Sequence, residues 1–529
     1  MPTIRAGDRL PLGLDPGKVL TVTADSISSA IVRTFASNTQ GLQSNGQITI
    51  AAGQSQSFGP YLVPQRFVVE GVAGAVSYSQ DDAISPLVVT QDPRTGLLMA
   101  SGMPVAIKRI EAVVKHIGSS SHNAIAFNQS TGLSAADMTV TIKAEMEADF
   151  VAVRLVALNR AANAINNNTA VVGVTETNAT DTSANIGTPV IGGSAYAQLA
   201  PAGTLNGWRA ATWAGASSIN VAAATTGQQF QLSDWIPLGS VARADGGSRP
   251  LLLWRTWRPG AASGNWSFNT CGSTARTASA AMRQRTFIAG QSFNDAVTTL
   301  GNTMSLGTTV VPVFPIVRFT VPVLSVWGVG DSTMQNNAQA PDGLSSWGLR
   351  ACNDVSTPTK PVVWANFGAS SQTALTAWNA AKAALAAGCP SPSVLVVQAA
   401  SVNDPTAPAN PSVRDREGQV ALALDVIATA RQYAIPVVVF CPLMPYNSLT
   451  LSYDNIRKGT NTAIAAIAAA NGVTVLNLAA LGDGASPERW VSAYNDGAGS
   501  AGDGIHPDED AFDAVLAPSL AAVLRALNG

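Results

Sequence analysis

The chain has 529 residues, 46% of them hydrophobic, and a formal net charge of −2. Charged residues make up 12% of the chain, about half of the ~25% that is usual in soluble proteins. This hydrophobic content excludes wholesale disorder, and the near-zero charge argues against a protein that binds nucleic acid or an anionic membrane surface. The sequence has no apolar run of the length and position of a signal peptide or of a membrane span, so we expect no secretory signal and no membrane insertion.

The length suggests about three domains, and the charge distribution indicates one boundary. Residues 1–320 contain 21 Lys and Arg against 17 Asp and Glu, a balance of +4. Residues 321–529 contain 10 against 16, a balance of −6. We therefore expect a small β-rich attachment and oligomerisation module over 1–100, a second β-rich domain over 101–320 and a third domain over 321–529.

Short β-branched runs between Ser, Gly, Asn and Gln turns predict strands throughout the first 320 residues. In the first module these runs are Val19–Thr23, Gln47–Ile50 and Arg66–Glu70. In the second domain they are Met138–Lys143, Phe150–Val156, Phe230–Leu232, Pro250–Arg255 and Val310–Val313. Asn166–Thr169 and Pro259–Gly264 are predicted loops. Regular strand spacing without long helices predicts a β-sandwich of jelly-roll type.

The pattern changes after Phe319, where buried apolar runs alternate with Ala-rich segments of helical length. The apolar runs begin at Leu324, Val362, Val394, Pro436 and Val473. The predicted helices are 374–387, 413–433, 453–470 and 508–527. Buried strands that alternate with helices predict a parallel α/β sheet with right-handed crossovers.

Residues with catalytic chemistry follow these runs, where an open α/β sheet binds its ligands. Ser332 follows the first run within Gly-Asp-Ser-Thr, Gly368 follows the second and Asn403 follows the third. Asp503 and His506 lie three residues apart near the end of the sequence. A serine hydroxyl is a poor nucleophile until a base takes its proton, and the base needs an orienting group. The set therefore predicts acyl transfer through a serine nucleophile.

The four sequence blocks that contain Ser332, Gly368, Asn403 and the Asp503–His506 pair occur in the order typical of one family. They resemble the SGNH (GDSL-like) hydrolase superfamily over about residues 321–529. The resemblance implies a flavodoxin-like α/β/α fold with a parallel sheet, and the activity of an esterase, a lipase or a carbohydrate deacetylase. It also implies that Ser332 is the nucleophile, that His506 is the general base and that Asp503 orients the base.

The resemblance further implies an oxyanion hole made of Gly368, Asn403 and the backbone N–H of the nucleophile. Thr333 and Asp404, which follow two of these positions directly, are candidate substrate-binding residues. The sequence departs from the family pattern at Ser401, because a glycine commonly precedes the Val-Asn-Asp segment.

No pattern in the sequence indicates a metal site or a cofactor. The four cysteines are Cys271, Cys352, Cys389 and Cys441. They lack CxxC spacing, which predicts buried free thiols. His116 and His122 have no acidic or cysteine partners at ligand spacing, so we expect surface or structural roles for them.

A tryptophan cluster in the second domain allows two interpretations. Trp254, Trp257 and Trp266 lie near Arg255 and Arg258. Such a cluster could stack on sugars, but burial in a sandwich core is the interpretation that we favour.

The β-rich, low-charge first 320 residues resemble virion-associated proteins of tailed phages and prophages in texture and domain order. That resemblance implies an esterase that removes O-acetyl groups from a host surface polysaccharide as part of a tail fibre or spike. It also implies attachment to other tail proteins through residues 1–100, a homo-oligomer with a trimer favoured, and a place in the virion tail.

Two alternatives stay open. One is a bacterial carbohydrate esterase or lipase-like enzyme with an accessory sandwich, either cytoplasmic or exported without a Sec signal. The other is a structural or adhesion tail protein whose esterase site is inactive or incidental.

Overall fold

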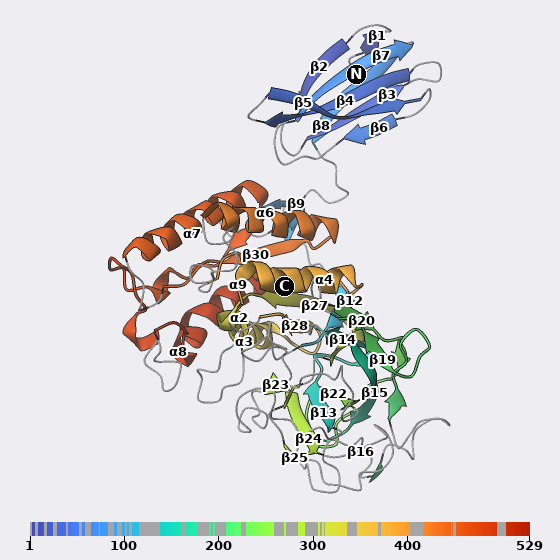
Figure 1. The fold of residues 1–529 in the computed structure, drawn as a ribbon, viewed down its shortest axis with the longest axis vertical. Coiled ribbons are helices and arrows are strands. Elements are labelled where there is room, and N and C mark those ends of the chain that lie inside the picture. Colours follow the sequence, from blue (N-terminus) through green and yellow to red (C-terminus); the bar gives the residue numbers. More distant parts are fainter. Residues whose placement is uncertain are drawn as a thin grey trace. The chain divides into compact units, whose positions relative to one another are not determined.

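The computed structural model divides the chain into two compact units, Met1–Val105 and Ala106–Gly529 (Figure 1). In the first unit the structure describes residues 3–5, 9–14, 18–24, 29–38, 41–51, 55–58, 65–73, 75–82, 89–91, 98–100 and 103–104. In the second unit it describes residues 108–115, 138–159, 164–177, 190–191, 194–195, 208–223, 229–258, 269–270, 284–290, 305–306, 309–310, 313–335, 346–368, 372–401, 416–445, 447, 451–494 and 504–528.

The first unit consists of antiparallel sheets, as its sequence predicts. Its strands are β1 (Thr3–Arg5), β2 (Arg9–Leu14), β3 (Lys18–Ala24), β4 (Ser29–Asn38), β5 (Gly41–Ile50), β6 (Ser55–Phe58), β7 (Gln65–Ala73), β8 (Ala75–Asp82), β9 (Val89–Gln91), β10 (Leu98–Ala100) and β11 (Met103–Pro104). Two four-stranded sheets have the orders β1-β8-β3-β6 and β2-β7-β4-β5, and β9 to β11 form a small third sheet. The three runs predicted here lie within β3, β5 and β7, which confirms them as strands.

The second unit begins with two antiparallel layers around one core. One layer contains β13 (Met138–Glu145), β15 (Ile165–Thr175), β18 (Arg209–Ala210), β19 (Ile219–Val221), β22 (Leu251–Arg258), β24 (Gln284–Gly290) and β25 (Ser305–Leu306). The facing layer contains β12 (Arg109–Val113), β14 (Phe150–Asn159), β20 (Gln229–Leu232), β21 (Ile236–Pro237) and the first part of β27 (Val313–Val329). Alternate residues of both layers, such as Ile142, Leu155 and Leu252, share one buried cluster. Two short pairs complete the strands: β16 (Val190–Ile191) with β17 (Ser194–Ala195), and β23 (Asn269–Thr270) with β26 (Thr309–Val310).

One predicted loop in this region is wrong. Asn166–Thr169 lies inside β15, not between strands. The strand contains a local irregularity at these turn-forming residues. Asn167 has a φ of 60°, and the pairing register between β15 and β19 shifts between Ile165 and Asn168. Asparagine tolerates this left-handed conformation better than most residues, so the strand continues through the turn signal. The loop predicted at Pro259–Gly264 lies outside the described residues.

A parallel sheet follows, and β27 is one of its strands. Its other members are β28 (Val362–Asn366), β29 (Val394–Gln398), β30 (Val437–Cys441) and β31 (Thr474–Val475). The spatial order is β28-β27-β29-β30-β31, with parallel pairing at each step. This is the flavodoxin-like order, in which the second strand lies outside the first. The predicted α/β sheet is therefore confirmed.

Helices cover both faces of this sheet (Figure 1). They are α2 (Ser332–Gln335), α3 (Trp347–Val355), α4 (Ala374–Ala386), α6 (Arg416–Gln432), α7 (Leu451–Asn471), α8 (Glu509–Ala511) and α9 (Ala517–Asn528), with a π-helical turn over Phe512–Leu516 and 3-10 turns over Ala479–Leu481 and Ser492–Tyr494. Helices α4, α6 and α7 pack on the face that presents Trp327, Leu395 and Phe440. Helices α3 and α9 contact each other, and α3 lies against β28 on the other face. Within the described residues, no helix combines the length and the apolarity that a membrane span requires.

The boundary predicted at residue 320 falls inside β27. The first part of this strand pairs with β12 and β14, and its last part pairs with β28 and β29. The two cores are also interleaved. Val323 and Val363 belong to the cluster of the antiparallel layers, whereas Phe314 and Ile316 belong to the cluster beneath α4. Residues 106–529 therefore form one compact unit.

We predict that a truncated chain starting at residue 321 will not unfold cooperatively, whereas a chain starting at residue 106 will. The shorter chain loses the first part of β27 and the apolar residues that it places beneath α4. Deletions of large buried side chains cost about 2–5 kcal/mol each, which is comparable with the stability of a whole domain. Thermal unfolding followed by circular dichroism measures this, and a cooperative transition in the 321–529 chain would contradict it.

Candidate active site

Ser332 lies directly after the strand shared by both sheets. It is the first residue of α2, two residues after Gly330, and its side chain is almost completely buried. Gly330 has no room for a side chain, because a Cβ there would lie 1.8 Å from Gln398 Oε1. The glycine therefore leaves room for the Gln398 side chain at the end of β27. The chain changes direction there and continues as α2.

His506 comes from the far end of the sequence and meets Ser332. Its Nε2 lies 2.8 Å from Ser332 Oγ. With Nε2 unprotonated, the serine hydroxyl donates this hydrogen bond, which is the arrangement that a general base needs. His506 lies two residues before Asp508, the N-cap of α8, whose side chain accepts a hydrogen bond from the N–H of Ala511 at 3.0 Å. The structure therefore brings together the predicted nucleophile and the predicted base.

Three predicted site residues, Asp503, Asn403 and Asp404, lie outside the described residues. Their predicted roles stay predictions. The described residues next to them in the sequence are Ser401 and Gly504.

Gly368 follows the end of β28 and lies in a turn that Asn366 holds. Its N–H donates to Asn366 Oδ1 at 2.8 Å, and Asn366 Nδ2 donates to the carbonyl of Met334 in α2 at 3.2 Å. Asn366 therefore ties the turn after β28 to the helix that begins with Ser332. For Gly368 to serve as an oxyanion donor, its N–H must turn from Asn366 Oδ1 toward the substrate oxygen.

Asp331, directly before Ser332, is fully buried and is satisfied by hydrogen bonds from two segments. Its Oδ1 accepts from the N–H of Thr333 at 2.9 Å and from Thr333 Oγ1 at 2.8 Å. Its Oδ2 accepts from Ser401 Oγ at 2.6 Å, and its own N–H donates to Gln398 Oε1 at 2.8 Å. A carboxylate buried away from bulk solvent needs such donors, so this network holds the turn after β27 against the loop after β29.

The placement of Thr333 corrects its predicted role. The side chain is 2% exposed, and its hydroxyl donates to Asp331 while accepting from Gln398 Nε2 at 2.5 Å. The Thr333 carbonyl also accepts from Trp347 Nε1 at 3.0 Å. These contacts engage the side chain within the turn that carries Ser332, and Thr333 supports that turn.

Ser401 departs from the family pattern, and the structure gives a physical reason for a serine there. It is completely buried, its hydroxyl donates to Asp331, and the same oxygen lies 3.1 Å from the carbonyl of Gln372, just before α4. A glycine could not supply this donor. Sequence reasoning missed the supporting roles of Asn366 and Gln398, although both are polar residues at the ends of apolar runs.

The described cysteines are Cys352, Cys389 and Cys441, and all three are buried thiols outside disulfides. Burial raises the pKa of the Cys389 thiol to about 12. Burial and then the negative charge of Asp331 raise the pKa of the Cys441 thiol. Because the thiolate is the reactive form, neither thiol is a nucleophile at neutral pH. Among the residues that the structure describes, no group of three or more His, Cys, Asp or Glu could hold a metal ion.

Of the predicted tryptophan cluster, Trp254 lies in the interior of the antiparallel layers. Trp254 is buried, and its Nε1 donates to the carbonyl of Val313 at 3.0 Å. The Arg255 guanidinium lies 4.4 Å from the ring centre of Trp208 and donates from Nε to Thr141 Oγ1 at 2.7 Å. Burial lowers the pKa of Arg255 to about 9. These contacts agree with the core interpretation; Trp266, His116 and His122 lie outside the described residues.

We predict that Ser401→Ala will lower the free energy of unfolding by about 1.5–3 kcal/mol, the typical contribution of a hydrogen bond to a charged group. The variant removes the donor at Asp331 Oδ2, and both residues are completely buried. Urea unfolding measures the change. Ser519→Ala is the matched control, because its exposed hydroxyl donates only to the carbonyl of Asn477. Equal stability of the Ser401 variant and the wild type would contradict the role of this contact.

No protein-family model matches the sequence, and a search of curated proteins finds no match. Solved structures do resemble it. A member of the lipolytic protein G-D-S-L family from Veillonella parvula DSM 2008 is 15% identical, with a TM-score of 0.27 over 38% of this chain and 96% of that one. Axe2, an acetylxylan esterase from Geobacillus stearothermophilus, is 14% identical, with a TM-score of 0.28 over 38% of this chain and 93% of that one.

A longer likeness covers 78% of this chain and 99% of a carbohydrate esterase family 2 enzyme plus carbohydrate binding domain from Corynascus thermopiles (Myceliophthora fergusii). Its identity is 10% and its TM-score is 0.28. Because the scores and identities of these three likenesses are low, the function proposed below rests on the contacts between this chain's own residues.

Proposed function

We propose that this protein is a serine carboxylic ester hydrolase of the SGNH type. The observation that carries the proposal is the 2.8 Å approach of His506 Nε2 to Ser332 Oγ. The two residues meet where β27 ends, in a sheet of flavodoxin-like order. That edge is where such sheets place their reactive groups.

In the proposed reaction, His506 Nε2 takes the proton of Ser332 as the serine oxygen attacks the ester carbonyl carbon. A tetrahedral intermediate forms, and His506 then gives the proton to the alcohol oxygen as its bond to carbon breaks. A water molecule, deprotonated by the same nitrogen, attacks the acyl-serine. The carboxylic acid leaves and the serine hydroxyl is restored.

The negative charge of the intermediate needs hydrogen-bond donors. The backbone N–H of Ser332 is one, since the first residue of a helix has no carbonyl partner four residues before it. We assign Asn403 and Gly368 as the others, with Gly368 released from Asn366 when substrate binds. Asp503 is assigned the orienting role on the resemblance of the sequence blocks to SGNH hydrolases, since it lies three residues before His506.

We further propose that the ester is an O-acetyl group on a bacterial surface polysaccharide and that the protein acts in a phage tail as a homo-oligomer, with a trimer favoured. Support comes from the sequence: the four blocks point to esterases and carbohydrate deacetylases, and the first 320 residues are β-rich with little charge. Attachment to other tail proteins through residues 1–100 belongs to the same proposal. A bacterial carbohydrate esterase outside a virion is the alternative with the same chemistry.

Ser332→Ala should reduce hydrolysis of p-nitrophenyl acetate by ~10⁴-fold or more, because the variant removes the nucleophile of a group that acts as a unit. Circular dichroism should show an unchanged fold. If the alanine variant kept more than a trace of the activity, Ser332 would not be the nucleophile. Absence of hydrolysis in the wild type on every acetylated glycan and p-nitrophenyl ester tested would favour the structural or adhesion alternative.

His506→Ala should cost nearly as much as loss of the serine, and Asp503→Asn should cost less, because the aspartate orients the base without transferring the proton. Steady-state kinetics on the same ester measure both. A His506 variant with near wild-type kcat would remove this residue from the mechanism.

The acyl group has its own test. Release of acetate from acetylated surface glycans should be accompanied by a preference for p-nitrophenyl acetate over the octanoate ester. A preference for the octanoate would point to a lipase and would contradict the deacetylase part of the proposal.

A further inference from the structure

The loop that carries His506 contacts Asn447, a described residue of the segment after β30. The N–H of Asn447 donates to the carbonyl of Gly504 at 2.6 Å. Gly504 has a φ of 78°, and a Cβ there would lie 2.9 Å from Asn447 Cβ. Both the left-handed backbone and the close approach require glycine at this position. The position of Asn447 therefore determines where this end of the His506 loop lies.

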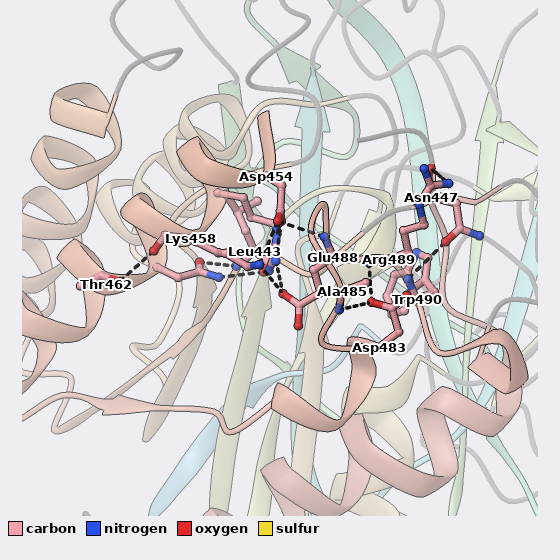
Figure 2. Close-up of polar contacts among 12 residues, drawn as sticks. Leu443, Asn447, Asp454, Lys458, Thr462, Asp483, Ala485, Glu488, Arg489 and Trp490 are labelled. Atoms are coloured by element: carbon pink, nitrogen blue, oxygen red, sulfur yellow. Dashed lines mark hydrogen bonds and ion pairs between the residues drawn. The ribbon is translucent and has the colours of Figure 1, made fainter. Parts of the chain in front are cut away.

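Asn447 is held from its other side by two neighbouring residues (Figure 2). Its Oδ1 accepts from the N–H of Trp490 at 3.2 Å. Its carbonyl accepts from Arg489 Nη1 at 2.9 Å. Asn447 thus links the segment after β30 both to the His506 loop and to residues 489–490.

Residues 489–490 belong to a loop that is anchored on α7 through a buried carboxylate. Asp454 is completely buried, and its Oδ2 accepts from the N–H of Glu488 at 3.0 Å. Arg457 Nη2 lies 2.7 Å from Asp454 Oδ1 and also pairs with Glu488, and Lys458 Nζ lies 2.9 Å from Asp454 Oδ2. Figure 2 shows this group next to the Asn447 contacts.

The negative charge of Asp454 strengthens the hydrogen bonds that hold this loop on α7. Burial alone would raise the pKa of its carboxyl, but the N–H of Glu488 and the cations Lys458 and Arg457 outweigh burial and lower it. The group is therefore ionised at neutral pH and holds its donors by charge-assisted hydrogen bonds. The same loop is shaped by Asp483 Oδ1, which accepts from the N–H groups of Ala485 and Arg489 at 2.9 and 3.1 Å.

We propose that Asn447 is a positioning residue that sets the approach of His506 to Ser332, an inference that rests on the function proposed above. His506 lies between two anchored points of the chain. On one side Gly504 is held by Asn447, and on the other side the N–H of Asp508 donates to the carbonyl of Tyr494 at 3.1 Å. Because a misplacement of ~1 Å between reacting groups can cost about 10²-fold in rate, loosening either point should reduce catalysis.

The side chain of Asn447 contributes an acceptor, and this allows a conservative rescue. Asn447→Ala leaves the N–H of Trp490 without Oδ1, whereas Asn447→Asp keeps an oxygen at the same place. Arg489→Ala loosens Asn447 through its carbonyl and truncates only an exposed side chain, so its fold is not at risk. A second Arg–Asn contact, Arg431 Nη2 to Asn471 Oδ1 at 3.3 Å, joins the C-terminal ends of α6 and α7 and supplies the controls Asn471→Ala and Arg431→Ala.

The experiment measures kcat and KM on p-nitrophenyl acetate and the second-order rate of Ser332 modification by a fluorophosphonate, with thermal unfolding alongside. We expect Asn447→Ala to lower kcat and the modification rate by the same factor, ~10-fold or more, with KM unchanged within about twofold, because the base acts in the transition state. Asn447→Asp should recover most of the loss, Arg489→Ala should show a smaller loss of the same kind, and both controls should equal the wild type.

Three results would overturn the role of Asn447. The first is a wild-type modification rate in both Asn447→Ala and Arg489→Ala. The second is a loss that Asn447→Asp does not recover, or one that follows only the fall in unfolding temperature. The third is a wild-type chain that neither hydrolyses esters nor reacts at Ser332; this result would also remove the proposed function, whereas the first two leave it standing.

Discussion

The buried carboxylate of Asp331 is the group on which the geometry of the candidate site depends. A buried charge is tolerated only when hydrogen-bond donors surround it, and an unpaired buried charge costs several kcal/mol. Here the donors come from the turn after β27 and from Ser401 in the loop after β29. The hydrogen bonds that satisfy Asp331 therefore hold the ends of β27 and β29 together. Ser332 lies in this turn, between Asp331 and Thr333.

A different set of contacts holds the loop that brings His506 to Ser332. Its loop is held by backbone hydrogen bonds at Gly504 and Asp508 and by the contacts of Asn447. Ser332 thus lies beside a buried network at the end of β27, and the contacts of the His506 loop lead through Asn447 to α7. This separation explains how residues 174 positions apart can be brought to hydrogen-bond distance without sharing an element of secondary structure.

Much of the fold and the two central site residues could be predicted from sequence, because their signals are local. Apolar runs and Ala-rich helices have a periodicity of their own, and Ser332 and His506 lie in short motifs at the ends of such elements. The boundary at residue 320 could not be predicted in this way, since a strand that serves two sheets resembles two strands. Sequence reasoning could not predict the contacts of Thr333, Asn366 and Asn447 either, because these contacts depend on which segments the fold brings together.

Mass spectrometry after reaction with a fluorophosphonate tests the central claim most directly. The reagent reports an activated serine without any assumption about the acyl group or the sugar. The account predicts one adduct within the described part of the chain, on Ser332, formed in the wild type and almost abolished in His506→Ala. An unmodified Ser332, or equal modification with and without the imidazole, would contradict the claim that these two residues form the reactive pair.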